Sequence, residues 1–309
     1  MCAPPMSTDP KTILIDLSYK GLIRASGADA VAFLQGQFST DIEKLTPPVG
    51  QLTSWNNAKG RVVTLLRLFR RGEDIYLGLP AGLKPAVLKR LSLYVLRSKV
   101  TLTDASGELD CLGLIGEGAT SLLARAGIPV PVQVNDVTTI ETLQALRLYG
   151  EVPRYVIYGT AAAITSLKKR WGSATVPGTE DDWALHRVLA GEPTIHPETS
   201  EHFVAQMLDL DKLGCIDFKK GCYIGQEVIA RAHYKGGVKR HLARAFSHTT
   251  TRLKPGTAIH ARGQNSPVAE VVDACLDASG VWQMQLVVQD DYREAELVHA
   301  DSGAAVKLV

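Results

Sequence analysis

The chain has 309 residues, of which 45% are hydrophobic and 21% charged, a composition typical of a globular protein with two or three domains. Its formal net charge of +2 excludes a global bias toward polyanions, so any basic surface must be local. No apolar run reaches membrane-spanning length, and residues 1–6 lack the basic and apolar regions of a secretory signal, so we expect a cytoplasmic protein without membrane contact.

The first 105 residues are predicted to form an N-terminal α+β domain. Apolar runs at 13–17 and 21–24 suggest a short pair of strands. Ser26 is expected to cap a helix whose buried stripe comprises Val31, Leu34, Phe38, Ile42 and Leu45. The unit is completed by strands at 51–55, 61–69, 75–79 and 100–103 and by a second helix at 83–96. Strands beside two helices favour an open-faced sandwich.

Residues 106–185 repeat this theme as a second α+β domain. Strands are expected at 112–115, 145–148 and 154–158, and helices at 118–126 and 161–171. In residues 239–309 the helical pattern disappears. Alternating runs separated by glycine and proline turns predict a small β-barrel or sandwich, with strands at 242–246, 257–261, 268–272, 281–288 and 304–309.

The five cysteines, at positions 2, 111, 215, 222 and 275, are odd in number and widely spaced. This argues against a disulfide framework. No pair has CxxC spacing and no Cys/His cluster has zinc spacing, so the sequence predicts no metal site made by the protein alone.

One cysteine stands in an informative stretch, residues 218–227. Gly221 and Gly225 bracket Cys222 in a tight loop before a helix that starts near Glu227. A thiol close to a helix N-terminus and beside Lys219 and Lys220 should favour the thiolate, because the dipole and the cations stabilise negative charge. The alternative is a small buried cysteine in a turn, and the residues alone leave both interpretations open.

The run Lys-Gly-Cys-Tyr-Ile-Gly-Gln-Glu at 220–227 matches the K-G-C-[FY]-x-G-Q-E signature of the YgfZ family, in the glycine-cleavage T-protein superfamily. Residues 27–29, 33–37, 58–61 and 98–100 also resemble that family, so the likeness spans about 21–245. It implies two ferredoxin-like α/β sandwich halves and a C-terminal small β-barrel around a central folate-binding hole. Residues 186–238 would pack back on the first half.

The resemblance implies an accessory protein that binds tetrahydrofolate or a derivative and acts through Cys222. Its partners would be iron–sulfur enzymes that it helps to assemble or repair, including enzymes that thiolate tRNA. One thiolate cannot hold a cluster alone, so a partner or a small thiol would complete the ligands. Cys215 is a weak candidate helper, expected to pack beside Leu213 instead.

Two other functions stay open at this point. One is a folate-dependent one-carbon transferase or tRNA-modifying enzyme with Cys222 as the nucleophile. The other is a folate-binding scaffold in which Cys222 is structural. Aminomethyl transfer itself is not expected, because residues 59–66 lack the acidic pair of the T-protein pattern and Leu189 stands where that pattern has a pterin-binding glutamate.

The resemblance also implies folate-contacting residues. Trp183 matches a family position associated with folate, although core packing of an amphipathic helix would equally explain a tryptophan there. Lys20 matches a second position, where the family can carry an aromatic ring, and Tyr19 adjoins it. The predicted cofactor-binding set is completed by residues of the cysteine motif and its helix: Tyr223, Gln226, Glu227 and Arg231.

Positive charge gathers after the motif. Between residues 219 and 240, only Glu227 opposes six cations: Lys219, Lys220, Arg231, Lys235, Lys239 and Arg240. This patch could hold a polyglutamate tail or an RNA backbone, or be a solvated surface without a ligand. Aromatic residues are sparse around it, so direct nucleic-acid binding is the weaker alternative.

Overall fold

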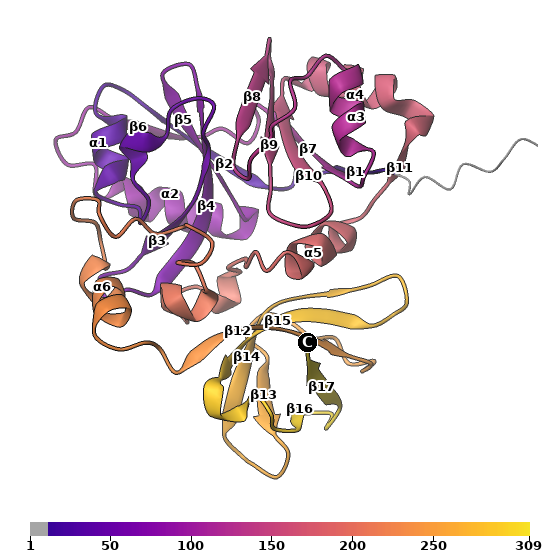
Figure 1. Ribbon diagram of the computed structural model, residues 1–309. Helices are drawn as coiled ribbons and strands as arrows, with labels where there is room; N and C mark the ends of the chain where they lie inside the picture. Colours follow the sequence, from indigo (N-terminus) through magenta and orange to yellow (C-terminus); the bar gives the residue numbers. More distant parts are fainter. Residues whose placement is uncertain (1–11) are drawn as a thin grey trace, which may run out of the picture.

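The computed structural model describes residues 12–309, so the predictions for residues 1–6 and Cys2 lie outside the described residues. The chain forms two β-sheets with their helices and a C-terminal barrel, and α5 (Glu180–Leu189) lies between the barrel and the sheets (Figure 1). The predicted α+β class and the predicted barrel are confirmed.

The first sheet has five antiparallel strands in the order β3-β4-β5-β2-β6. Its strands are β2 (Gly21–Ser26), β3 (Gln51–Asn56), β4 (Val62–Arg71), β5 (Asp74–Leu79) and β6 (Thr101–Asp104). Two helices, α1 (Ala30–Gln35) and α2 (Lys84–Ser92), bury apolar side chains in its core. The strands predicted at 51–55, 61–69 and 75–79 are therefore confirmed within two residues.

The second sheet has six strands in the order β11-β1-β7-β10-β9-β8. Its strands are β1 (Thr12–Asp16), β7 (Asp110–Ile115), β8 (Val137–Ile140), β9 (Leu143–Arg147), β10 (Arg154–Gly159) and β11 (Thr175–Pro177). The helices α3 (Ala119–Arg125) and α4 (Ala161–Trp171) share a hydrophobic core with β7 and β10. Both helices were predicted from the sequence.

The predicted pairing of the first two strands is wrong. β1 pairs with β7 and β11 in the second sheet, whereas β2 pairs with β5 and β6 in the first. Each strand is thereby paired along both of its edges, whereas a hairpin of the two strands alone would leave one edge of each unpaired. The chain therefore crosses from one sheet to the other at residues 17–20, and the predicted domain limits remain predictions.

The predicted long helix after Ser26 is also wrong. α1 ends at Gln35, and Ser26 is the last residue of β2. Phe38 then forms a bridge to Trp55 of β3, and a short 3-10 turn follows at Ile42–Lys44. Phe38, Ile42 and Leu45 are fully buried, as expected for the stripe, but an irregular loop brings them into the core.

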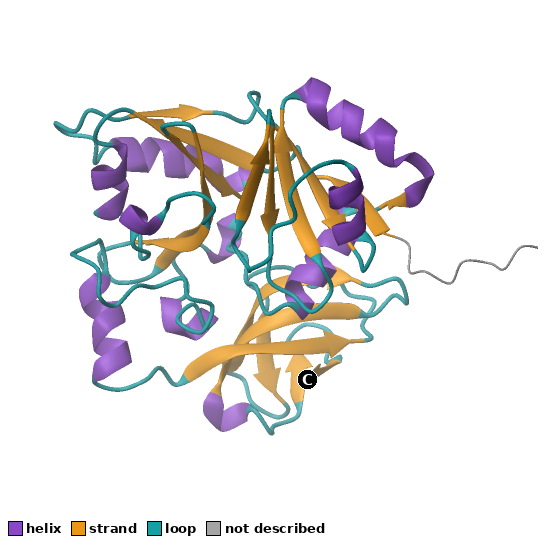
Figure 2. Cartoon of the chain, turned by 45° about the horizontal axis from the view of Figure 1, so that its top comes forward, coloured by secondary structure: helices purple, strands orange, loops and turns teal. Residues whose placement is uncertain are grey.

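The two sheets pack face to face, with their helices on the outside (Figure 2). The shared core takes Leu22, Phe69 and Tyr76 from the first sheet and Cys111, Val156 and Tyr158 from the second. Phe69 stacks on Tyr158 across this interface, with ring centroids 4.6 Å apart. Trp183 of α5 belongs to the same cluster, so α5 closes one end of it.

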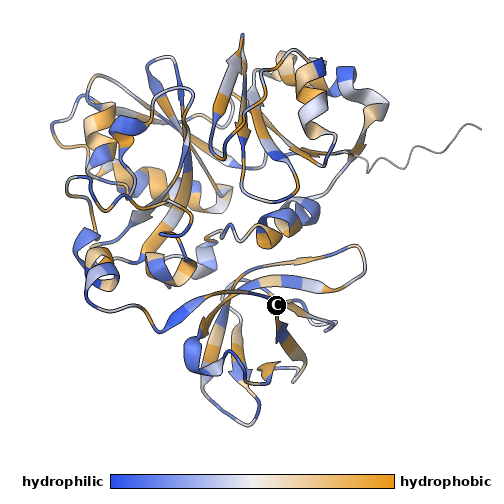
Figure 3. Ribbon diagram, in the orientation of Figure 1, coloured by the Kyte–Doolittle hydropathy of each residue, from blue (hydrophilic) through white to orange (hydrophobic). Residues whose placement is uncertain are grey.

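The C-terminal strands form a closed barrel in the order β12-β15-β14-β13-β16-β17. The strands are β12 (Arg240–Ser247), β13 (Ala258–Ala261), β14 (Pro267–Leu276), β15 (Trp282–Gln289), β16 (Leu297–His299) and β17 (Ala305–Leu308). The sequence missed β16, β8 and β11, each only three or four residues long. Hydrophobic colours run along the strands and hydrophilic ones mark many of the loops (Figure 3).

Between α5 and the barrel, the chain returns to the first sheet. Phe203, Leu208 and Ile216 pack in the core of that sheet, and α6 (Gln226–Tyr234) follows on its outside. Among residues 12–309, no helix is long and apolar enough to cross a membrane.

Candidate functional site

A cavity of about 780 Å³ lies where the two sheets, α5 and the barrel meet. The first sheet contributes Leu52, Leu65 and Arg67, and the second contributes Leu148, Val156 and Tyr158. The barrel contributes Leu253 and Asp273. The volume falls within the range of natural small-molecule sites, which combine an apolar wall with a few placed polar groups.

Trp183 enters the cavity wall from α5. This helix starts in a capping box, in which the side chains of Thr179 and Asp182 satisfy each other's backbone N–H. The indole packs over β7 at Gly113, where an added Cβ would lie 2.5 Å from Trp183 Cζ3. Trp183 is only 1% exposed. Its two sequence interpretations therefore coexist, because the ring is packed in the core and also lines the cavity.

Lys20 lies beside Trp183, as the prediction of a shared site requires. Its Nζ is 4.8 Å from the centroid of the indole ring, within cation–π range. Burial, reinforced by the nearby Arg187 guanidinium, lowers the pKa of Lys20 to about 7. Tyr19 also lines the cavity, but it is an exposed side chain and does not replace Lys20 at the indole.

A buried carboxylate is bonded by two arginines at another part of the wall, where Glu192 and Arg67 line the cavity and Arg154 does not. Arg67 Nη2 lies 2.7 Å from Glu192 Oε1, and Arg154 Nη2 contacts the other carboxylate oxygen. Burial alone would raise the pKa of Glu192, but the two guanidinium groups outweigh it and hold the pKa at about 2. Glu192 is therefore a carboxylate already engaged by two cations.

A second ion pair joins the barrel to α5. Asp273 of β14 accepts hydrogen bonds from Arg187 Nε at 3.1 Å and pairs with His196 Nε2 at 2.9 Å. The carboxylate is 3% exposed, and Arg187 and His196 lower its pKa despite the burial. These contacts position the barrel as the third wall of the cavity.

The loop that carries Cys222, residues 218–225 (the thiol loop), does not line the cavity. Cys222 is exposed, whereas Cys111, Cys215 and Cys275 are buried. Gly225, with φ of +82°, ends the loop and precedes α6. A Cβ at Gly225 would lie 2.5 Å from the carbonyl oxygen of Asn57, so the loop rests directly on the turn between β3 and β4.

Cys215 is buried in the core of the first sheet, and burial raises the pKa of its thiol to about 12. Its Sγ lies 3.7 Å from the carbonyl oxygen of Leu213, the neighbour expected from the sequence. Such a thiol stays protonated near neutral pH and is closed to solvent, so the structure does not support it as a helper for Cys222.

Lys220 corrects a sequence prediction, because its ammonium is not a cation free to stabilise a thiolate or bind a polyanion. Nζ donates to the backbone carbonyls of Gln35, Phe38 and Thr40 at 2.6, 2.6 and 2.8 Å. Burial lowers its pKa to about 8. Lys220 therefore fastens the thiol loop to the segment after α1, and that segment follows no regular pattern that a sequence could reveal.

The four remaining residues predicted to bind the cofactor do not line the cavity. Tyr223 is buried in the core of the first sheet, with its ring 5.1 Å from Lys220 Nζ, and Gln226 begins α6. Glu227 and Arg231 pair with each other on the exposed surface of α6 at 3.3 Å. The structure thus brings Lys20 and Trp183 together at one site and these four residues together with Cys222 at another.

Five cations of the predicted basic patch are exposed around α6 and the start of the barrel: Lys219, Arg231, Lys235, Lys239 and Arg240. Figure 1 shows α6 at the far side of the first sheet from α5. Within the described chain, no group of three or more His, Cys, Asp or Glu side chains gathers in a way that could hold a metal ion.

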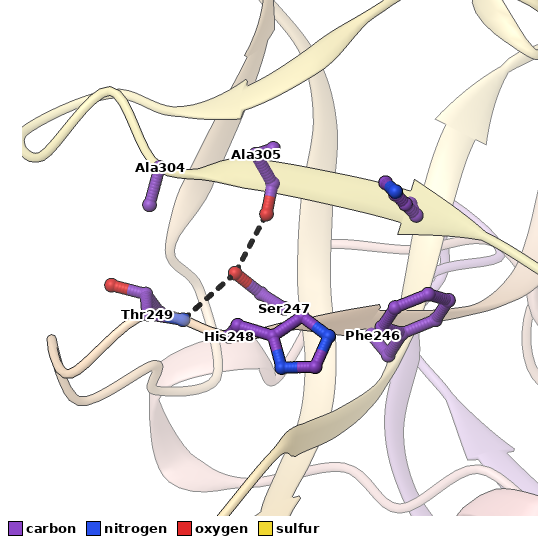
Figure 4. Close-up of a pocket in the computed structure, with 7 residues that line it drawn as sticks. Phe246, Ser247, His248, Thr249, Ala304 and Ala305 are labelled. Carbon is purple, nitrogen blue, oxygen red and sulfur yellow. Dashed lines mark hydrogen bonds between the residues drawn. The ribbon is translucent and has the colours of Figure 1, made fainter.

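A smaller hollow of about 200 Å³ opens at the edge of the barrel between β12 and β17 (Figure 4). Ser247 Oγ donates to the carbonyl oxygen of Ala305 at 2.7 Å and accepts from the backbone N–H of Thr249 at 3.4 Å. These bonds close the barrel edge and leave no charged group at the centre of the hollow other than the flanking Lys307. We assign it a structural role.

Sequence reasoning missed three charged residues that line the cavity, Arg67, Glu192 and Asp273, and also Arg154, which pairs with Glu192. Arg67, Arg154, Glu192 and Asp273 come from β4, β10, the segment after α5, and β14. Each stands alone in its local pattern, and only the fold brings them together. The one available signal was the charge on Arg67 and Arg154 within otherwise apolar strands, which requires a buried partner.

Comparison with known proteins gives matches along nearly the whole chain. A family model described as the GCVT N-terminal domain matches residues 6–145. The tRNA-modifying protein YgfZ of Colwellia psychrerythraea is 35% identical over 239 residues, which cover 77% of this chain and 73% of that protein. The protein of the same name from Cronobacter sakazakii is 28% identical over 306 residues, covering 97% and 92% of the two chains.

Among solved structures, the glycine cleavage system aminomethyltransferase T from Bartonella henselae superposes with a TM-score of 0.77. The superposition covers 97% of this chain and 86% of that one, at 18% sequence identity. This likeness shows a shared fold of two sheets and a barrel.

Proposed function

The chain belongs to the YgfZ family, and from that premise we propose that it binds tetrahydrofolate in the central cavity and acts through Cys222 in tRNA modification. The proposed action is to support the assembly or repair of iron–sulfur enzymes, including those that thiolate tRNA. The tRNA-modification context comes from the relatives, which are named tRNA-modifying proteins.

The observation that carries this proposal is the separation of the thiol from the cavity. Cys222 is exposed on a loop beside α6 and is absent from the cavity lining. An exposed thiol can meet a cluster or a client protein at the surface while a small molecule occupies the cavity. Because one thiolate cannot complete the coordination of a cluster, the client or a small thiol supplies the other ligands.

The cavity residues fit a folate. Tetrahydrofolate joins a flat, neutral, hydrogen-bonding ring to an anionic glutamate, and it supplies a carrier for one-carbon units when bound. The apolar wall at Leu52, Leu65 and Ile195 suits the ring, and the ammonium of Lys20 suits the anionic end. The protein's own contribution is to bind and orient the molecule away from bulk water.

The alternative of a folate-dependent transferase with Cys222 as nucleophile has less support. A nucleophile must reach the reacting atom to within about 3–3.5 Å, and Cys222 does not line the cavity. Residues 59–66 lack the acidic pair of the T-protein pattern, and the residue of this stretch that lines the cavity, Leu65, offers no carboxylate. The carboxylate of Glu192 is held by two arginines. The two buried carboxylates that line the cavity, Glu192 and Asp273, are both held in ion pairs, so neither is a free acid–base group of the aminomethyltransferase kind.

The proposal predicts that Cys222→Ala leaves folding and folate affinity unchanged but abolishes support of iron–sulfur enzymes. The reason is that Cys222 is exposed and lies away from the cavity. The measurement is complementation of a bacterial strain that lacks its own YgfZ, with tRNA thiolation and an iron–sulfur enzyme activity as readouts.

Cys275→Ala is the matched control, because it removes a thiol that is buried in the barrel. It should complement the strain if the exposed thiol is the one that acts. Full complementation by Cys222→Ala would refute the proposed role of the thiol. Catalytic consumption of a one-carbon tetrahydrofolate by the purified protein would favour the transferase instead.

A further inference from the structure

We propose that the outer surface of α6 and the thiol loop binds a single-stranded segment of RNA, whose bases stack on His233 and Tyr234 and whose phosphates contact the surrounding cations. The inference goes beyond the proposed function, which requires no contact of this chain with RNA, and only the choice of RNA over DNA rests on that function. We call this exposed set of residues the α6 surface: Lys219, Arg231, His233, Tyr234, Lys235, Lys239 and Arg240.

The α6 surface carries a local excess of positive charge. Its five cations are all exposed, while the net charge of the sequence is only +2, so the rest of the chain is net negative. The one acid between residues 218 and 240 is Glu227, which pairs with Arg231 at 3.3 Å on the exposed side of α6. Water and salt screen such a pair, so Arg231 can still contact another anion.

The acids that flank this window are engaged elsewhere. Asp217 contacts Lys44 Nζ at 2.7 Å. Asp290 adjoins the surface, since its backbone N–H donates to the carbonyl oxygen of Lys239 at 3.0 Å, but its carboxylate pairs with His241 at 2.8 Å. Within residues 12–309, neither carboxylate pairs with a cation of the α6 surface. The positive charge therefore faces solvent.

The fold adds an aromatic cluster to these cations. Phe218 of the thiol loop stacks on His233 of α6, with ring centroids 3.8 Å apart and ring planes inclined by 16°. Tyr234 lies edge-on to both rings, with its centroid 6.1 Å from Phe218 and 4.7 Å from His233. The expectation of sparse aromatic residues is therefore corrected, because Phe218 and His233 are distant in the sequence and only the fold stacks them.

Core packing does not account for the outer rings of this cluster. Phe218 is partly buried against the core of the first sheet and holds the stack in place. His233 is exposed and Tyr234 is 68% exposed, so their burial contributes little to folding. Exposed aromatic rings among cations are the arrangement with which proteins bind single-stranded nucleic acids, since every base has a face that can stack on them.

A second basic helix end lacks this arrangement. The last turn of α4 has three consecutive cations, Lys168, Lys169 and Arg170. Lys168 pairs with Asp16 at 2.6 Å, and Arg170 donates to a backbone carbonyl oxygen at 2.9 Å. The aromatic residue that follows, Trp171, is only 4% exposed. The end of α4 therefore offers positive charge without a stacking ring and provides an internal control.

The composition of the α6 surface favours RNA over an acidic protein. The buried centres of protein interfaces are apolar and depleted in lysine. Three of the five cations here are lysines, and the large hydrophobic side chains exposed on α6 are only Val228 and Tyr234. A duplex is also disfavoured, because its bases stack on one another and cannot reach an aromatic ring. The unstacked bases of a single strand suit both the rings and the cations.

The test is fluorescence anisotropy of the full-length protein with a labelled single-stranded RNA of about 12 nucleotides, without folate or a client protein. A DNA strand and an RNA duplex of the same sequence and an oligoglutamate peptide are the comparison probes. We expect saturable binding of the single-stranded RNA, about tenfold or more tighter than binding of the duplex or the peptide.

Two kinds of variant separate stacking from charge. Tyr234→Ala should raise the Kd for the RNA about tenfold without changing its salt dependence, and Tyr234→Phe should restore the affinity. Lys219→Ala and Lys235→Ala should each reduce the slope of log K against log salt by about 0.7, because each removes one phosphate contact. Lys169→Ala, at the end of α4, is the matched control and should change neither quantity. All four substituted side chains are exposed, so the variants should fold.

The comparison of probes on the wild-type protein does not depend on any variant folding. The α6 surface is overturned as an RNA site by RNA binding that Tyr234→Ala leaves unchanged, by tighter binding of the DNA strand, or by equally tight binding of the duplex or the peptide. Absence of RNA binding by the wild-type protein overturns it too. None of these results bears on the proposed function, which is tested separately by complementation with Cys222→Ala.

Discussion

Lys220 shows how a residue of the cysteine motif can act through structure. Its ammonium reaches three backbone carbonyls of the segment from Gln35 to Thr40, and it lies 5.1 Å from the Tyr223 ring. Cys222 follows two residues later on an exposed loop. The lysine therefore fixes the base of the loop, and the thiol is presented from that base.

We predict that Lys220→Met lowers the free energy of unfolding by about 3 kcal/mol, because three buried carbonyls lose a charged donor. Lys219→Met is the control, since Lys219 is exposed and should change stability by less than about 0.5 kcal/mol. Chemical denaturation of both variants measures the difference. Equal stability of the two would show that the three hydrogen bonds contribute nothing.

At the residue scale, residues that belong to a recognisable motif could be predicted from the sequence, whereas residues that only the fold brings together could not. Cys222 was selected by its signature, and its exposure agrees with a functional thiol. Lys20 and Trp183, 163 positions apart by their numbering, meet as expected. Arg154 and Glu192 carry no motif, so their pairing depends on β10 and the segment after α5 coming together.

At the element scale, the junction between the thiol loop and α6 depends on one glycine. Gly225 adopts φ of +82° and lies against the carbonyl oxygen of Asn57 and the backbone of Gly60. Both a left-handed backbone and the close approach exclude a side chain there. Gly221, on the other side of Cys222, has open space around it.

Gly225→Ala should therefore destabilise the protein by about 2 kcal/mol or more, through backbone strain and the contact with Asn57. Gly221→Ala should change stability by less than about 0.5 kcal/mol. Thermal unfolding of the pair, together with the rate at which an aromatic disulfide reagent modifies Cys222, measures both the stability and the order of the loop. A Gly225→Ala variant as stable as Gly221→Ala would contradict this account.

The predicted strands and helices were correct where the local sequence pattern determines the structure. The strands at 51–56 and 74–79 combine alternation with turn residues at their ends, and both were found. The helix expected to run from 27 to 45 failed, because Phe38, Ile42 and Leu45 keep helical spacing while tertiary contacts bury them from a loop. Short strands such as β16 (Leu297–His299) depend on neighbours that no local window contains.

At the scale of the whole molecule, three units enclose one cavity. The two sheets supply the apolar wall, α5 supplies Trp183, and the barrel is fastened through the bonds of Asp273 to Arg187 and His196. The thiol loop lies outside, where the turn between β3 and β4 supports α6. The molecule therefore separates the central cavity from a surface thiol.

Sheet pairing and the cavity itself could not be predicted from residues alone. The order β11-β1-β7-β10-β9-β8 joins strands from both ends of the first 177 residues, and no local signal specifies such long-range partners. The resemblance to a family supplied the ring arrangement as an expectation. The charged residues that line the cavity come from distant parts of the chain, so they could be identified only from the folded structure.

The most direct test of this account is calorimetric titration with tetrahydrofolate of the wild-type protein and of Ala184→Trp, in which a large ring fills the cavity from α5. Ala86→Trp, on the exposed surface of α2, is the matched control. We expect saturable binding of one folate per chain by the wild-type protein and by Ala86→Trp, and little or none by Ala184→Trp. Undiminished binding by folded Ala184→Trp would place the folate elsewhere, and no binding by the wild-type protein would remove folate from the account.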